Sequence, residues 1–151
     1  MFLRVLLAAL ALHAFLYLTG RPFRADMRLT GQLLILALFN NVIPFSLIFT
    51  GQTELGAGLA SVINATTPFW TVIAAQVLTS DEKISANKLA GIGLGVAGAT
   101  ILVGPSALAG IGGPAWAKFA VMGATVSYAL AAIFARRLRG VSPAHVAAGQ
   151  L

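Results

Sequence analysis

Two short stretches of the sequence bring asparagine, threonine and proline together and so concentrate hydrogen-bonding groups. These residues are Asn40, Asn41, Pro44, Asn64, Thr67 and Pro68. Proline removes a backbone donor and frees the carbonyl one turn earlier, so Pro44 should expose the carbonyl of Asn40, and Pro68 that of Asn64. Each stretch therefore offers amide and carbonyl groups that a small polar molecule can bind.

Both stretches lie near the middle of long apolar segments, residues 31–49 and 58–78. An amide that faces hydrocarbon loses its water partners at a cost of roughly 1 to 3 kcal/mol, so these groups should face a protein interior or a wet cavity. Secondary transporters place substrate sites near the membrane midplane, where helices are interrupted. The alternative is that the asparagines only bridge neighbouring helices, each bond contributing about 0.6 kcal/mol.

Two further features bear on this region. Trp70 lies between Thr67 and Thr71, which share the helical face of Asn64, so it could add an aromatic wall to the amides, although packing is the more frequent role of such a side chain. Gly91, Gly95 and Gly98 lie on one later apolar segment, and their spacing is typical of close helix packing. Their packing partner could belong to this chain or to another subunit.

Residues for catalysis or metal binding are sparse. The chain has no cysteine, and its acidic residues fall outside the apolar segments. His13 and Tyr128 lie inside apolar segments, where a structural role is the simpler interpretation and a substrate or proton role the alternative. A pairing of Ser127 with the distant His13 does not meet the geometry of a nucleophile and its base. The sequence predicts no enzyme, no metal site and no cofactor.

Composition predicts a lipid environment. Hydrophobic residues make up 58% of the chain and charged residues only 9%, with a mean hydropathy of +0.90. Soluble domains carry roughly 25% charged residues. The net charge of +6 comes from basic residues between apolar segments, so membrane topology explains it better than nucleic-acid binding.

A membrane-spanning helix needs about 20 apolar residues. That criterion predicts five spans, at residues 2–19, 33–49, 58–78, 89–104 and 116–135. Ser142 and Pro143 begin a further apolar stretch that predicts the first turn of a sixth helix. The predicted fold class is therefore an all-α integral membrane protein with about five transmembrane helices and the start of a sixth.

Basic residues give the orientation, because Lys and Arg concentrate on the cytoplasmic side. Alternate connections carry Arg21, Arg24, Arg28, Lys83, Lys88, Arg136, Arg137 and Arg139. The opposite connections carry only Lys118. This places Met1 on the outside, which leads us to expect that another helix precedes it and that the chain is part of a longer protein.

Residues 40–45 (Asn-Asn-Val-Ile-Pro-Phe), 58–68 and 88–105 together resemble the EamA family of the drug/metabolite transporter superfamily. The resemblance implies a ten-helix fold built from two inverted five-helix repeats. Residues 1–140 would then be a partial first repeat, family helices two to five, plus helix six. Residues 141–151 would be a linker and the start of helix seven.

The same resemblance implies a secondary transporter in the cell's inner (plasma) membrane. It would move small metabolites such as amino acids by alternating access, without ATP. The cavity would lie between two halves, so the expected partners are the second repeat of the same parent chain or a dimer partner, the lipid bilayer and a small-molecule substrate, with no nucleic acid. Matched by position, the asparagine, threonine and proline residues of the two stretches would line the cavity.

Two other functions fit the sequence less well. A membrane scaffold or assembly subunit would use the glycine helix to bind a partner and its asparagines to lock packing. A small dimeric multidrug efflux protein generally depends on a carboxylate inside the membrane, and no Asp or Glu lies deep within a predicted span.

Overall fold

The computed structural model describes residues 2–20, 23, 26–79, 84–104 and 112–150. These residues form helices and turns and contain no strand, which confirms the predicted all-α class. The helical elements are α1 (Phe2–Leu18), α2 (Met27–Ala37), η1 (Leu38–Val42), α3 (Ile43–Gly51), α4 (Ala57–Asn64), α5 (Thr67–Leu78), α6 (Ala86–Val103), α7 (Ala115–Ala135), η3 (Arg136–Leu138) and α8 (Pro143–Gly149).

Four helical segments of the described chain are long and apolar enough to cross a membrane. They are Met27–Gly51, Ala57–Leu78, Ala86–Val103 and Ala115–Leu138, and they confirm four of the five predicted spans. The first predicted span is a helix of 17 residues whose apolar part, Val5–Leu18, falls short of that length. Of the basic residues that set the predicted orientation, Arg21, Arg24 and Lys83 lie outside the described residues.

Side-chain caps fix the starts of three helices. The Asp26 carboxylate accepts a hydrogen bond from the backbone N–H of Leu29 at 2.7 Å and begins α2. Ser85 caps α6 in the same way, and Ser142 caps α8, which therefore begins at the predicted Ser142–Pro143 step. Such caps satisfy backbone donors that the first turn of a helix leaves unpaired.

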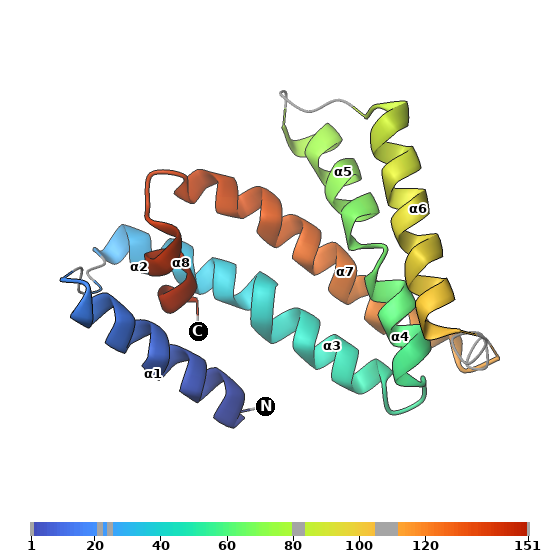
Figure 1. The fold of residues 1–151 in the computed structure, drawn as a ribbon, viewed down its shortest axis with the longest axis horizontal. Coiled ribbons are helices and arrows are strands. Elements are labelled where there is room, and N and C mark those ends of the chain that lie inside the picture. Colours follow the sequence, from blue (N-terminus) through green and yellow to red (C-terminus); the bar gives the residue numbers. More distant parts are fainter. Residues whose placement is uncertain (1, 21–22, 24–25, 80–83, 105–111, 151) are drawn as a thin grey trace.

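Helix α7 is the centre of the bundle, with α3, α4, α5 and η1 packed against it (Figure 1). Its buried positions are mostly small, which lets neighbouring backbones approach closely. The closest approach is at Gly51, where an added Cβ would lie 2.7 Å from Val121 Cγ2 and 2.9 Å from the Ala117 carbonyl oxygen. The end of α3 therefore lies directly on α7.

Helix α6 is peripheral. It packs against α4 and α5 at one end of the molecule and has no buried residue (Figure 1). An added Cβ at Gly91, Gly95 or Gly98 would meet no atom of the described chain within 4 Å. The predicted glycine packing therefore has no partner among the described residues, and we retain it only as a prediction of contact with another subunit.

Candidate functional site

The polar residues of the first stretch lie on a turn of π-helix inside a membrane span. Helix α2 continues through the π-helical turn Leu38–Val42 into α3, and this turn contains Asn40 and Asn41. Residue 39 is midway between residues 27 and 51, the ends of the span. A π turn contains one residue more than an α-helical turn, and such turns are frequent at functional sites. Both asparagines therefore lie near the midplane.

Pro44 leaves one backbone carbonyl of this turn without its helical donor, and Ser127 donates a hydrogen bond to that carbonyl. The N–H of Ile43 bonds to the carbonyl of Leu38, five residues back, so the next donor in that register would belong to residue 44. That residue is proline and has no N–H. The Ser127 hydroxyl donates to the Phe39 carbonyl instead, at 2.7 Å. From α-helical spacing, Pro44 was predicted to expose the carbonyl of Asn40. In the π turn the carbonyl that bonds outside its own helix is that of Phe39, one residue earlier.

The two asparagine amides converge on Gln150, which ends α8. Asn40 Nδ2 donates to Gln150 Oε1 at 3.0 Å, and Asn41 Nδ2 donates to the Gln150 backbone carbonyl at 2.9 Å. All three residues are partly exposed. An open cavity of about 460 Å³ adjoins them between α1, the α2–α3 segment and α8, with Asn41, Ser46 and Gln150 as the polar residues in its lining. Amide groups thus border a hollow near the midplane.

The second stretch interrupts its span at the same depth. Helix α4 ends at Asn64, α5 begins at Thr67, and the midpoint of residues 57–78 falls between Thr67 and Pro68. The Thr67 hydroxyl donates to the Asn64 carbonyl at 2.6 Å, so a side chain satisfies the carbonyl that Pro68 was predicted to expose. The Asn64 and Pro68 side chains are exposed. Trp70 is half-buried, with its ring edge-on to Phe69 at 5.5 Å between centroids.

The structure therefore brings the predicted site residues into two groups. One holds Asn40, Asn41 and Pro44, and the other extends from Asn64 to Trp70. Both groups lie on segments that pack against α7. Among the described residues, no hydrogen bond of these side chains joins one group to the other.

Two residues at the first group were not predicted to belong to the site. Ser127 is at the centre of the span Ala115–Leu138, so comparing span midpoints would have revealed it. Gln150 has no such signal, because only the return of α8 to the bundle places it beside Asn40.

The contacts of the His13 side chain suit a structural role. Its Nδ1 lies 2.8 Å from the Ala9 carbonyl, and its ring contacts Phe23, which stacks in turn on His145. No group of three His, Cys, Asp or Glu side chains suited to a metal ion occurs among the residues that the structure describes.

Comparison with known proteins gives one match. Residues 1–104 match the EamA-like transporter family, which is more than half of the 151 residues. No curated protein and no solved structure matches the chain.

Proposed function

Since this chain belongs to the EamA-like transporter family of the drug/metabolite transporter superfamily, we propose that it moves small polar metabolites, such as amino acids, across the cell's inner (plasma) membrane by alternating access. It is a multi-pass membrane protein. The observation that carries the proposal is the irregular turn with Asn40 and Asn41 at the middle of its span, beside a cavity of about 460 Å³.

Amides suit a substrate that has both donors and acceptors. An asparagine side chain offers one carbonyl oxygen and two N–H donors, and it carries no charge that must be desolvated. In the described structure Asn40 and Asn41 each donate to Gln150, so the substrate would exchange with these bonds on entering. That exchange would couple binding to a movement of α8 relative to the α2–α3 segment.

The second group supplies the other part of the proposed site. Asn64, Thr67, Pro68 and Trp70 lie at an interruption of similar depth, and a broken helix can bend there without losing further backbone hydrogen bonds. We assign residues 1–140 to family helices two to six, and residues 141–151 to the linker and the start of helix seven. The opposite wall of the cavity would come from a second repeat or a second copy.

Transport by purified protein in vesicles tests this proposal. We expect accumulation of at least one member of a panel of radiolabelled amino acids above the level in protein-free vesicles. Replacing Asn41 by Leu removes an amide that borders the cavity, and it should lower that uptake roughly fivefold or more, because a lost polar contact to a substrate costs about 1 to 3 kcal/mol. Asn64→Leu should also lower it.

The matched control is Asn87→Leu, because Asn87 is exposed in the first turn of α6 and far from the midpoint of its span. Uptake should be unchanged by this control. Equal uptake by the wild type, Asn41→Leu and Asn64→Leu would contradict the proposed site. Specific partner assembly with no accumulation of any panel member would instead support the scaffold function.

A further inference from the structure

The cavity beside the π turn combines a few amide groups with an apolar lining. Its polar lining residues are Asn41, Ser46 and Gln150, and none of its ten lining residues is charged. The apolar lining residues are Val5, Leu34, Ala37, Val42, Phe45 and Phe49. The volume of about 460 Å³ lies within the range of about 300 to 1,000 Å³ that is usual for small-molecule sites. A ligand that suits this cavity is therefore small, with a hydrogen-bonding group and an apolar remainder.

The amides at this cavity act as hydrogen-bond donors. Asn40 and Asn41 both direct Nδ2 at oxygen atoms of Gln150, at 3.0 and 2.9 Å. A backbone carbonyl only accepts, so the contact with the Gln150 carbonyl fixes which atom of the Asn41 amide faces Gln150. Two donors from adjacent residues thus converge on two oxygens of a single residue. A ligand that takes the place of Gln150 needs two acceptors in the same region.

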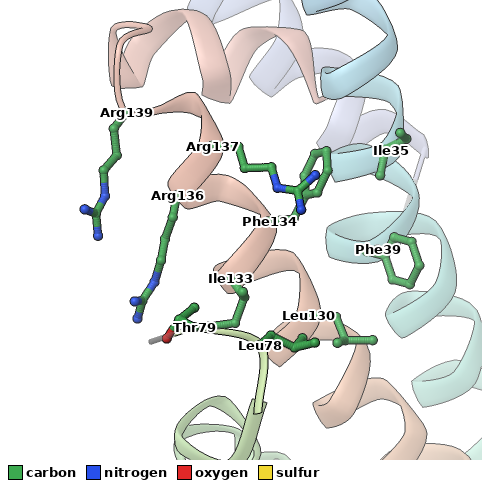
Figure 2. A pocket seen from close by; sticks show the side chains of 10 residues that line it. All are labelled: Ile35, Phe39, Leu78, Thr79, Leu130, Ile133, Phe134, Arg136, Arg137 and Arg139. Carbon is green, nitrogen blue, oxygen red and sulfur yellow. The ribbon is translucent and has the colours of Figure 1, made fainter. Parts of the chain in front are cut away.

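The described charged side chains lie outside this cavity. The arginines at the end of α7 line a different cleft, together with Ile35 and Phe39 of the α2–η1 segment (Figure 2). The two hollows share no lining residue. Of the acidic residues that the structure describes, Asp26 caps the start of α2 and Glu54 follows the end of α3. Because the whole chain has ten basic and four acidic residues, its overall field favours an anion over a cation.

We propose that the ligand presents a carboxylate to Asn40 and Asn41 in place of the two Gln150 oxygens and extends an apolar tail along the rest of the lining. The inference rests on the proposed transport function and narrows its substrate class to small carboxylates with an apolar side chain. An ionised carboxylate only accepts hydrogen bonds and has an oxygen for each donor. Such charge-assisted bonds are about twice as strong as neutral ones. No acidic side chain lines the cavity to bind an ammonium group, so recognition does not depend on one.

Equilibrium binding of radiolabelled isocaproate and isoamylamine to the purified full chain in detergent tests this inference. Isocaproate is leucine without its amino group, and isoamylamine is leucine without its carboxylate, so the two share a branched apolar tail. At neutral pH the acid is ionised. Isocaproate should bind saturably and roughly tenfold or more tightly than the amine, because only the acid forms the charge-assisted bonds. Propionate, with a much shorter tail, should bind roughly tenfold or more weakly than isocaproate, because each buried methylene contributes about fourfold in affinity.

The variant Asn41→Asp tests the donor assignment, because it replaces the donating NH₂ group by a carboxylate oxygen of similar size. It should bind isocaproate roughly tenfold or more weakly, since like charges then meet, and it should bind isoamylamine more tightly than the wild type does. The matched control is Asn87→Asp, in the exposed first turn of α6 and outside the lining, which should retain the preference for the acid. If Asn41→Asp does not fold, Asn41→Ala should weaken acid binding without any gain for the amine.

Gln150 has its own test, because the ligand displaces its oxygens. Gln150→Ala removes the Oε1 acceptor and frees the Asn40 amide, so isocaproate should bind roughly threefold or more tightly. Gln52→Ala is the control, because Gln52 is exposed at the end of α3, and it should leave the affinity unchanged. Weaker acid binding by Gln150→Ala would show that Gln150 helps to bind the ligand, and it would overturn the inference.

Equal binding of isocaproate and isoamylamine would overturn the inference, as would equal binding of isocaproate and propionate or a lack of saturable acid binding. An unchanged acid preference in a folded Asn41→Asp variant would do the same. These outcomes are separate from transport in vesicles. Accumulation of an amino acid by a chain that binds acid and amine equally would leave the proposed function standing. Acid binding that depends on Asn41, with no accumulation of any panel member, would contradict the proposed function and retain the carboxylate site.

Discussion

At the scale of single residues, the Ser127 hydroxyl compensates for the missing donor of Pro44. A proline inside a helix leaves an acceptor without its usual partner, and within a membrane there is no water to replace it. Ser127 is buried on α7 and donates to the Phe39 carbonyl. The bond therefore both satisfies the acceptor and ties the π turn to the central helix.

Replacing Ser127 by Ala should destabilise the protein by about 1 kcal/mol, the range found for hydrogen bonds between membrane helices. The effect is measured by unfolding in detergent, and Ser61→Ala is the control, because the exposed Ser61 hydroxyl bonds to Ala57 within its own helix. In a Pro44→Ala background, the new backbone N–H can reach the Phe39 carbonyl, so the cost of Ser127→Ala should shrink. An equal cost in both backgrounds would refute this explanation of the π turn.

The chemistry of the site residues was predictable one by one, but their partners were not. Apolar flanks and the proline spacing were enough to place Asn40 and Asn41 near the middle of a span. Their common acceptor, Gln150, is more than one hundred positions away, and no local pattern encodes that contact. The choice of the Phe39 carbonyl likewise depends on π geometry, which α-helical spacing does not describe.

At the scale of helices, the glycine that permits α3 to pack closely on α7 is Gly51, whereas the glycines of α6 make no such contact in the described chain. The spacing of Gly91, Gly95 and Gly98 was the stronger sequence pattern, yet these residues face open space in the described chain. Gly51 is a lone glycine at the end of a helix, and its importance comes from the Ala117 carbonyl on α7. Spacing indicates that a close approach is possible, whereas the fold decides where it occurs.

Gly51→Ala should therefore destabilise the contact between α3 and α7. The added methyl group would meet a backbone oxygen at 2.9 Å that cannot simply rotate away, so we expect a loss of about 1 to 3 kcal/mol. Thermal unfolding in detergent measures it. Gly91→Ala, which adds the same group in open space, should leave the unfolding temperature unchanged or slightly higher. A larger loss for Gly91→Ala than for Gly51→Ala would contradict the described packing.

At the scale of the whole molecule, three spans carry their irregular or polar positions at one depth. The π turn, the interruption between α4 and α5, and Ser127 each fall at or next to the midpoint of their span. Span lengths and proline positions were sufficient to predict the first two. The central place of α7 was not predictable, because its apolar pattern resembles that of the other helices and only its contacts distinguish it.

The central claim is that Asn41 borders a water-accessible cavity that receives substrate at the midplane. The chain has no cysteine, so a single Ser46→Cys variant, which leaves Asn41 intact and lies in the lining of the same cavity, can be treated in vesicles with a charged, membrane-impermeant thiol reagent. The control is Leu94→Cys, because Leu94 lies at the midpoint of α6 with a side chain that is 75% exposed and would face lipid. We predict that the reagent modifies the Ser46→Cys variant, that a transported amino acid slows this modification, and that the Leu94→Cys variant stays unmodified. Failure of the reagent to modify the Ser46→Cys variant, or modification of that variant that no transported amino acid slows, would contradict the account.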